Sequence, residues 1–227
     1  MSGLRSKLLM GATFIALPYY MLRCKKLLKD QNSTAMQKEL KRYGDDFLGI
    51  RGISVKTFGE EHYLDYDKCI FVSNHQSHND IFILLSCLKK PFRFIAKKEL
   101  FTSAIFKNFM KLSQSYPLDR DDDRASLLVL KQAVEDINHQ NASVVVFPEG
   151  TRSRGKTMNP FKAGLFSMLR RADAPIIPIY IKNSYDNDAR VFEVYFGEPI
   201  INGKKRGPEL CEESYQAILK LQNEYDS

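Results

Sequence analysis

The stretch NHQSHND, from Asn74 to Asp80, places a histidine and an aspartate five residues apart, directly after a short apolar run. An aspartate that accepts a hydrogen bond from one imidazole nitrogen fixes the tautomer of the ring, and the other nitrogen can then take a proton from a hydroxyl. His75 and Asp80 are therefore candidates for a dyad that acts as a general base. The alternative for this segment alone is a polar strand-to-helix turn with a capping aspartate.

The two side chains can meet only if particular elements position them. Within one continuous helix they would point to different faces, because five residues at 3.6 per turn leave them roughly 140° apart. We therefore expect His75 in a turn and Asp80 in the first turn of the helix that follows. The sequence fits this requirement, since Ile81–Leu88 can form a helix body that Ser77 or Asn79 would cap.

A second candidate site is the stretch FPEGTRSR, from Phe147 to Arg154. Gly150 permits a tight turn, and Arg152 and Arg154 place guanidinium groups suited to phosphate beyond the end of another apolar run. Glu149 could accept hydrogen bonds from a hydroxylated substrate or hold an arginine in place. The alternative is a solvated basic turn.

The same region also matches the nucleotide-binding pattern GxxxxGK[ST], from Gly150 to Thr157. Against that function, Pro160 would fall in the first turns of the helix that such a loop must open. The two later predicted strands are followed by Lys182 and Gly197, so neither ends in an aspartate that could hold Mg²⁺. A P-loop nucleotide-binding protein is therefore the less favoured alternative.

Composition and motifs argue against several other functions. The net charge of +7 favours an acidic partner such as an anionic membrane surface or a phosphorylated substrate. No nucleic-acid-binding module accompanies the basic residues, so no nucleic-acid partner is expected. His75 and His78 lack a clear third ligand, so no metal site is expected either. Four scattered cysteines without a CxxC pair are typical of reduced thiols.

The N-terminus carries an uncharged run, Leu8–Leu22, flanked on both sides by Lys and Arg. As a helix this run would be about 22 Å long, short of the roughly 30 Å of a bilayer core. An interfacial anchor is favoured, with apolar residues and tyrosines below the headgroups and lysines on anionic lipid. We expect residues 1–48 to form membrane-anchoring helices, the second over Ala35–Phe47, on the cytoplasmic face. A spanning helix and an ordinary core helix are the alternatives.

The remainder, 49–227, is long enough for one sizeable core and is expected to form the catalytic domain. The predicted strands are 50–57, 69–73, 92–96, 116–118, 143–147, 176–181 and 191–196. The predicted helices are 81–88, 97–112, 121–139, 163–171 and 208–225. This alternation implies an α/β fold, a single mixed sheet flanked by helices. Because chemistry gathers at the carboxyl ends of strands in such sheets, we expect the dyad loop, the Lys97–Lys98 end and the loop after Phe147 to be neighbours.

Taken together, these motifs resemble those of the glycerolipid acyltransferases typified by 1-acyl-sn-glycerol-3-phosphate acyltransferase. NHQSHND resembles the NHxxxxD motif of that family, and FPEGTRSR resembles its FPEGTRS motif. The resemblance covers roughly residues 50 to 200, with intermediate signatures in the order of the family. These signatures are FRFIAKKELF at 92–101, PLDR at 117–120, FKAG at 161–164, APIIPI at 174–179 and, more weakly, GEPI at 197–200.

The resemblance implies transfer of a fatty acyl group from a thioester, acyl-CoA or acyl carrier protein, to the free hydroxyl of a lysophospholipid. With 1-acyl-glycerol-3-phosphate as the acceptor, the product is phosphatidic acid. Another lysophospholipid or glycerol 3-phosphate is the alternative acceptor. The thioester is a co-substrate, and no other cofactor is implied. The membrane association of the family also agrees with the expected N-terminal anchor.

The resemblance also implies roles for individual residues. His75 would be the general base and Asp80 would orient it, so that the hydroxyl attacks the thioester without an acyl-enzyme. Asn74 would steady the turn. The substrate-binding candidates are Glu149 and Arg152 for the glycerol phosphate, Gly150 and Thr151 for the shape of the turn, and Lys97 or Lys98 for additional charge.

The chain departs from the family pattern at three positions. After KKELF the family usually carries a Pro and then a Gly, where this chain has Ala104 and Lys107. Another Gly, expected before PLDR, is replaced by Gln114. These positions lie near where the family is thought to house the acyl chain, so they bear on acyl-chain length and on the acceptor.

Overall fold

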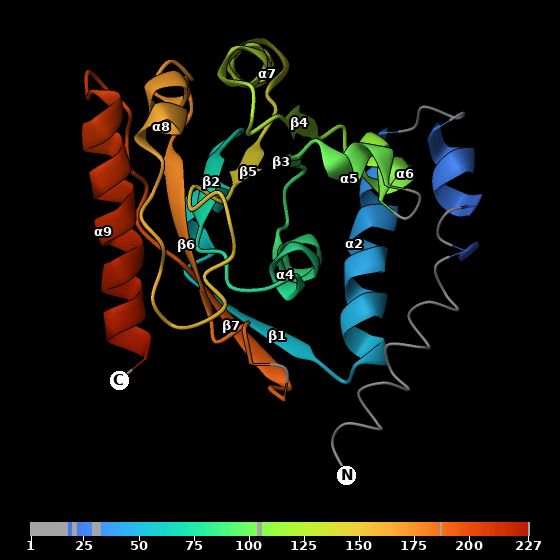
Figure 1. The fold of residues 1–227 in the computed structure, drawn as a ribbon. Helices are drawn as coiled ribbons and strands as arrows, with labels where there is room; N and C mark the ends of the chain where they lie inside the picture. The colour runs from blue at the N-terminus through green and yellow to red at the C-terminus, as the bar shows by residue number, and fades with distance from the viewer. Residues whose placement is uncertain (1–17, 20–21, 29–32, 104–105, 187, 227) are drawn as a thin grey trace.

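The computed structural model describes residues 18–19, 22–28, 33–103, 106–186 and 188–226, and for Ser33 and Thr34 it describes the backbone alone. A sheet runs through the centre of the molecule, with helices on both of its faces (Figure 1). The strands are β1 (Ser54–Phe58), β2 (Ile70–Ser73), β3 (Arg93–Lys97), β4 (Tyr116–Leu118), β5 (Val144–Val146), β6 (Ile176–Lys182) and β7 (Val191–Phe196). The helices are α2 (Ser33–Ile50), α3 (Glu61–Leu64), α4 (Asn79–Cys87), α5 (Glu99–Thr102), α6 (Lys107–Leu112), α7 (Asp123–Gln140), α8 (Ala163–Leu169) and α9 (Gly207–Tyr225).

The strands form one 7-stranded mixed sheet in the order β1-β7-β6-β2-β5-β3-β4. β6 and β7 are antiparallel, whereas the other neighbouring pairs are parallel. β2, β5 and β6 are central and almost wholly buried, which explains why their sequences are apolar runs without alternation. The predicted single mixed sheet flanked by helices is confirmed.

Different helices cover the two faces of the sheet (Figure 1). On one face α7, α8 and α9 pack over Val144 and Ile176. On the other face α2 and α4 pack over Phe71. The rings of Phe47 and Phe82 stack between α2 and α4 with their centroids 3.5 Å apart. The helix that carries Asp80 is therefore held between the sheet and α2.

Most of the run expected to anchor the N-terminus, Leu8–Leu22, lies outside the described residues. The second expected helix corresponds to α2, and α2 shares a hydrophobic core with α4. The boundary between residues 1–48 and 49–227 stays a prediction. Among the described residues, α2 packs into the same hydrophobic core as α4 and the sheet. Among the described helices, none has an apolar stretch of the length needed to cross a membrane.

The continuous helix predicted over 97–112 is wrong, because the structure divides this region into α5 and α6. Ser103 follows α5 in an extended conformation, with φ −57° and ψ 132°. Its hydroxyl accepts a hydrogen bond from the N–H of Phe106 at 3.4 Å. Serine side chains that bond nearby backbone in this way compete with a continuing helix and favour the start of a new one.

Gln114, one of the departures from the family pattern, adopts a left-handed conformation with φ +50°. It follows α6 in a turn in which the N–H of Gln114 bonds the carbonyl of Lys111 and the N–H of Ser115 bonds that of Met110. This pair of bonds is the Schellman arrangement, whose left-handed position is usually glycine. The turn is therefore kept in this chain, with a strained residue at the position where the family has glycine.

Candidate active site

The dyad turn lies between β2 and α4. Asp80 is in the first turn of α4, and His75 is in the turn before it, as their spacing requires. His75 Nδ1 and Asp80 Oδ2 are 2.7 Å apart, so the expected hydrogen bond is present. The start of a helix also favours a negative charge, because unpaired backbone N–H groups gather there.

Asp80 is fully buried and is surrounded by hydrogen-bond donors. Besides His75, its Oδ2 accepts from the backbone N–H of Gln76 at 2.7 Å and of Ser77 at 2.9 Å. Its Oδ1 accepts from the hydroxyl of Ser184. A carboxylate that only accepts requires the proton of the imidazole to lie on Nδ1, which leaves the lone pair of His75 on Nε2.

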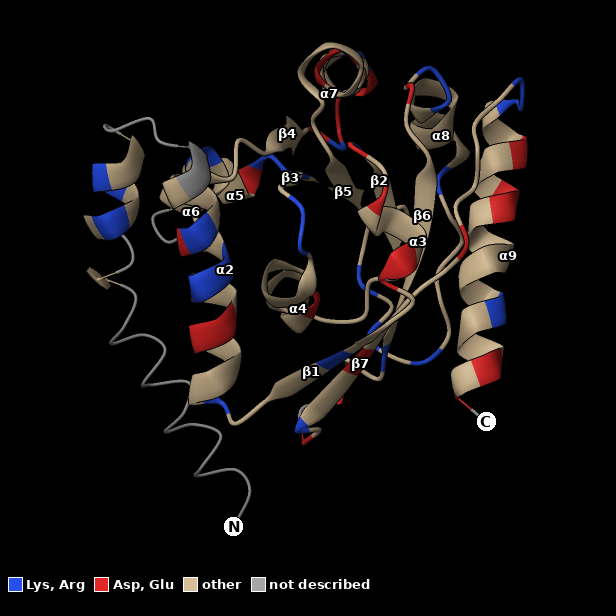
Figure 2. Cartoon of the chain, turned by 180° about the vertical axis from the view of Figure 1, so that it is seen from behind, with Lys and Arg blue, Asp and Glu red and all other residues tan. Residues whose placement is uncertain are grey.

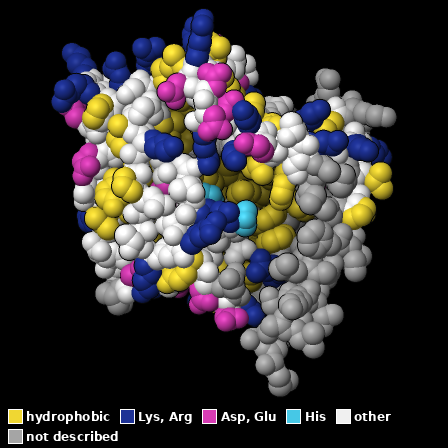
Figure 3. All heavy atoms as spheres, viewed as in Figure 1, with side chains coloured by type: hydrophobic (Ala, Val, Ile, Leu, Met, Phe, Trp, Pro, Cys, Tyr) yellow, Lys and Arg dark blue, Asp and Glu magenta, His cyan; other side chains and the backbone are white. Residues whose placement is uncertain are grey.

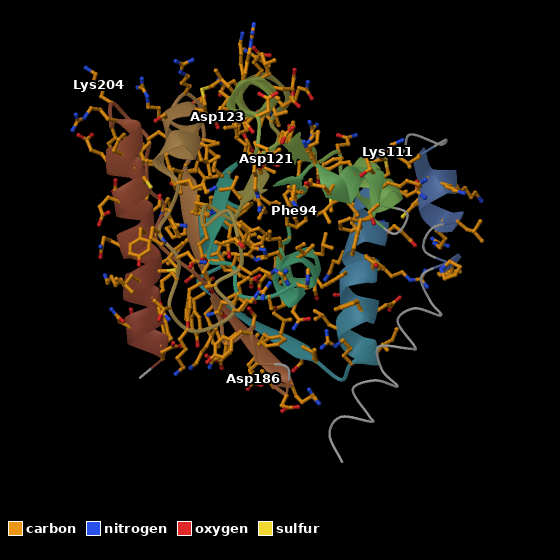
Figure 4. All side chains as sticks on the ribbon, in the orientation of Figure 1. Phe94, Lys111, Asp121, Asp123, Asp186 and Lys204 are labelled. Atoms are coloured by element: carbon orange, nitrogen blue, oxygen red, sulfur yellow. The ribbon has the colours of Figure 1, made fainter. Side chains whose placement is uncertain are left out.

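The ring of His75 stacks on Phe147, with centroids 4.2 Å apart and planes at 22°. Its side chain is 15% exposed, and within the described residues its Nε2 makes no hydrogen bond. Figure 3 shows histidine side chains at the rim of a hollow with hydrophobic side chains inside it and Lys or Arg side chains beside it. The ring centroid of Phe94, a residue labelled in Figure 4, is 6.4 Å from that of Phe147. The site thus places the imidazole of His75 between an apolar hollow and positive charge.

Asn74 fixes the start of the dyad turn. Its side-chain amide donates to the carbonyl of Ile181 at 3.0 Å and accepts from the N–H of the same residue at 2.8 Å. Both bonds reach the neighbouring strand β6, to which the backbone N–H of Asn74 also donates, at the carbonyl of Ile179 and 3.4 Å. Asn74 therefore steadies the turn, as expected.

Glu149 lies directly behind His75 and is 3% exposed. Its Oε1 accepts from the backbone N–H of His75 at 2.6 Å, and its Oε2 accepts from the N–H of Asn159 at 2.8 Å. Burial raises the pKa of Glu149 above its usual value, and these backbone hydrogen bonds offset part of that rise. Because both oxygens bind the backbone, Glu149 supports the dyad turn, and contact with a substrate stays a prediction.

The loop after β5 is tied to the dyad turn. The N–H of Ser153 donates to the carbonyl of His75 at 2.8 Å. Gly150 has φ +71°, a conformation that favours glycine. A Cβ at this position would lie 3.1 Å from the ammonium nitrogen of Lys162, so the lysine is packed against the glycine. Lys162 belongs to the FKAG motif, and the sequence did not single it out as part of the site.

The arginine loop lies beside this turn. Arg152 is half-buried, and Thr151 and Arg154 are exposed. Partial burial, followed by the positive charge of Arg152, lowers the pKa of His78. The positive charges of Arg152 and Arg154, which act on His78 in the same direction as its burial, favour an anionic ligand at the site.

The expected neighbourhood of three loops is confirmed by the sheet order, since β2 pairs with β5 and β5 pairs with β3. Lys97 and Lys98 lie at the end of β3, and each is about half exposed. Lys97 pairs with Glu99 at 3.1 Å, and Lys98 pairs with Asp119 at 2.5 Å. A role in binding phosphate stays a prediction for both lysines, because each is held by a carboxylate of the protein.

The nucleotide-binding alternative is wrong. A P-loop requires a helix that begins at its Lys and Thr, which are Lys156 and Thr157 here. The structure has no helix at these residues, and α8 begins only at Ala163. As for metals, the described part of the chain contains no cluster of three or more His, Cys, Asp or Glu side chains that could hold one.

Two further residues of the site were not identified from the sequence. Gln76 donates to the carbonyl of Gly155 at 3.2 Å and accepts from the N–H of Ser184 at 2.9 Å. Ser184 lies just after β6, and β6 is a parallel neighbour of β2. The rule that sites gather at the carboxyl ends of parallel strands could have pointed to this loop.

This geometry fits a class of enzymes in which a buried histidine–aspartate pair, at the carboxyl edge of an α/β sheet, activates a hydroxyl close to an anionic group. The comparison with protein families is more specific. The family model Acyltransferase matches residues 54–182, which is more than half of the chain. The chain therefore belongs to the acyltransferase family.

Similar proteins carry related names. A 1-acyl-sn-glycerol-3-phosphate acyltransferase of Saccharomyces cerevisiae is 36% identical over 135 residues, which is 59% of this chain and 44% of that protein. A chloroplastic 1-acyl-sn-glycerol-3-phosphate acyltransferase of Brassica napus is 40% identical over 111 residues, which is 49% of this chain and 32% of the relative. The matched region thus spans less than half of the length of either relative.

The crystal structure of the 1-acyl-sn-glycerophosphate (LPA) acyltransferase from Thermotoga maritima has the same fold. The TM-score is 0.84 at 21% sequence identity, and the match covers 100% of this chain and 98% of that chain. At this level of identity the likeness establishes the fold alone.

Proposed function

We propose that this protein transfers a fatty acyl group from acyl-CoA or acyl carrier protein to the free hydroxyl of 1-acyl-glycerol-3-phosphate, which yields phosphatidic acid. The observation that carries the proposal is the 2.7 Å hydrogen bond between His75 Nδ1 and Asp80 Oδ2, with Nε2 left without a partner among the described residues. The membership of the acyltransferase family and the names of the similar proteins support this choice of reaction.

In this mechanism His75 Nε2 takes the proton of the acceptor hydroxyl as its oxygen attacks the carbonyl carbon of the thioester. The new C–O bond forms first, and the C–S bond then breaks as the tetrahedral intermediate collapses. The departing thiolate takes the proton from the imidazolium, so His75 returns to its starting state. Asp80 stabilises the imidazolium between these two steps, and no acyl-enzyme is needed.

The phosphate of the acceptor would bind the arginine loop. Arg152 offers a planar fork of N–H donors that matches phosphate oxygens, and Lys162 lies in the adjoining turn against Gly150. Lys97 and Lys98 add positive charge at the neighbouring strand end. Binding at this loop would bring the free hydroxyl of the glycerol toward the dyad, because Ser153 joins the loop to the backbone of His75.

The direct test supplies purified protein, on vesicles or in detergent, with a long-chain acyl thioester and lysophosphatidic acid. Release of free thiol together with formation of phosphatidic acid is the expected result. Both acyl-CoA and acylated carrier protein are tried as donors, and other lysophospholipids and glycerol 3-phosphate as acceptors. Absence of thiol release with every donor and acceptor would overturn the proposed function.

We expect Arg152→Ala to raise the KM for lysophosphatidic acid by about 10- to 100-fold, because a charge-assisted hydrogen bond contributes about 1.5–3 kcal/mol. The kcat at saturating acceptor should change much less. Arg170→Ala is the control, since Arg170 is an exposed arginine after α8, at the end of the sheet where β6 begins. An equal effect of the two substitutions on KM would argue against phosphate binding by Arg152.

We also propose that residues 1–48 bind the cytoplasmic surface of a membrane. Figure 2 marks in blue the positions of Lys and Arg residues along α2 and along the short helical segment before it. The exposed basic residues of these two segments are Arg23, Lys25, Lys26, Lys38, Lys41 and Arg42. Positive charges at this density favour an anionic lipid surface.

Substituting both Lys25 and Lys26 by glutamate is expected to weaken binding to anionic vesicles by at least about 30-fold, at about 1 kcal/mol for each lysine lost. Vesicle flotation measures the effect, with neutral vesicles for comparison. The control substitutes Lys204, which precedes α9, and Lys220, which lies on α9. Figure 4 labels Lys204 on the side of the molecule away from α2. Equal loss of binding in the two double variants would contradict an N-terminal site.

A further inference from the structure

Ser184 is fully buried next to the dyad and uses all of its polar groups there. Its N–H donates to Gln76 Oε1 at 2.9 Å, and its carbonyl accepts from the side chain of Asn79 at 3.5 Å. Its hydroxyl lies against Asp80 Oδ1 and is 3.2 Å from Gln76 Oε1. Every one of these partners belongs to the dyad turn or to the first turn of α4.

The single proton of the Ser184 hydroxyl must go to one of two acceptors. Asp80 Oδ1 is the closer of the two and carries charge, whereas Gln76 Oε1 already accepts the N–H of Ser184. Hydrogen bonds to a charged acceptor are the stronger ones, so the proton lies on the side of Asp80. The hydrogen-bond geometry thus assigns the hydroxyl to the carboxylate.

The two oxygens of Asp80 are held very differently. Three N–H groups fix Oδ2, one of them from His75. Oδ1 has the Ser184 hydroxyl and, at 3.5 Å, the hydroxyl of Ser77, which is at the limit of a hydrogen bond. Without Ser184 this buried carboxylate oxygen would lack a close donor, and leaving such a group unsatisfied is unfavourable.

Gln76 extends this contact to the arginine loop. Its carbonyl oxygen binds the N–H of Ser184, while its amide donates to the carbonyl of Gly155 at 3.2 Å. One buried side chain therefore joins the dyad turn, the loop after β5 and the loop after β6. The position of the base relative to the arginines depends on this connection.

We propose that Ser184 is a positioning residue, whose hydroxyl fixes the rotation of the Asp80 carboxylate and thereby the direction in which His75 presents Nε2. This role rests on the proposed function of His75 as the base. Ser184 itself does not touch the reacting atoms. Its loss therefore affects the orientation of the base and leaves the binding of the substrates intact.

The first test compares Ser184→Ala with the unaltered protein in the acyl-transfer assay. The kcat should fall by about 10- to 100-fold, the size of effect expected when a reacting group is misplaced by about 1 Å. The KM values for lysophosphatidic acid and for the thioester should stay within about 2-fold. Ser184→Thr keeps the hydroxyl, so it should recover most of the kcat.

Ser214→Ala is the matched control. Ser214 is also fully buried, and its hydroxyl donates to the carbonyl of Leu210 at 2.7 Å within α9. Both substitutions remove a buried hydroxyl, so a general loss of stability would affect both proteins. Only the Ser184 variant should lose kcat at temperatures well below unfolding. If Ser184→Ala does not fold, Ser184→Cys keeps a similar volume with a weaker donor, and its kcat should lie clearly below that of the unaltered protein.

A second readout does not depend on activity. The proton that His75 Nδ1 shares with Asp80 should give a downfield NMR signal, which His75→Ala identifies among the 4 histidines by its disappearance. Ser184→Ala should shift or broaden this signal, and Ser214→Ala should not. If the signal responds but no acceptor is acylated, the proposed function fails and the positioning role stands. If the protein is active while Ser184→Ala keeps both the full kcat and the signal, the positioning role is overturned.

Discussion

His75→Ala is expected to lower the kcat for acyl transfer by about 10²- to 10⁴-fold, because general-base catalysis by a positioned side chain contributes a factor of this size. In the proposed mechanism the imidazole both accepts the hydroxyl proton and returns it to the leaving thiolate. Alanine removes both steps while Phe147 and the backbone of the turn stay in place. Continuous detection of the released thiol gives kcat and KM directly.

The control for this variant is His62→Ala. His62 is far from the dyad in the fold, where its ring bonds the carbonyl of Phe196 at 2.9 Å and faces Glu198 at 3.3 Å. This variant tests whether the loss of any partly buried histidine lowers activity by reducing the stability of the fold. Retention of more than about a tenth of the kcat by His75→Ala would be incompatible with its role as the base.

Asp80→Asn is expected to fold and yet to lose about 10²- to 10³-fold in kcat, because only the charge is removed. The carbonyl oxygen of the asparagine can take the place of Oδ2 and keep the three N–H donors. Its amide then faces the hydroxyl of Ser184, which can turn to accept from it and donate to Gln76 Oε1 at 3.2 Å. The imidazolium formed during the reaction would lack its counter-charge.

The comparison with Asp80→Ala separates charge from structure. Alanine leaves three donors in a buried place without acceptors, at a cost of about 1–3 kcal/mol each. Thermal unfolding should therefore show a large loss of stability for Asp80→Ala and a small loss for Asp80→Asn. Equal melting temperatures, or full activity of Asp80→Asn, would contradict the role assigned to the carboxylate.

Much of the fold could be predicted from the sequence because the central strands are continuous apolar runs. The residues of β2, β5 and β6 are buried on both faces, so their sequences separate them clearly from the amphipathic pattern of α7. The short helix α3 and the break at Ser103 were missed. Both depend on a few local hydrogen bonds that leave no periodic signal.

The arrangement that the dyad needs could be predicted from spacing, with His75 in a turn and Asp80 in the first turn of the next helix. The choice of a dyad over a capping aspartate rests on the second motif and on the family resemblance. The roles of the supporting side chains could not be predicted. The sequence allowed Glu149 to bind a substrate or to hold an arginine, and it gave no sign that both oxygens accept from the backbone N–H groups of residues 75 and 159. Ser184 is separated from Asp80 by 104 positions, and only the pairing of β2 with β6 brings them together.

The order of the strands also bears on when the dyad becomes enclosed. β2 lies between β5 and β6, both of which follow it far along the chain. A chain still emerging from the ribosome carries His75 and Asp80 long before it carries the strands that enclose them. Pairings between such distant segments require closure of large loops and are slow to form. We therefore expect the contacts that enclose the dyad to form late in folding, when the central sheet is complete.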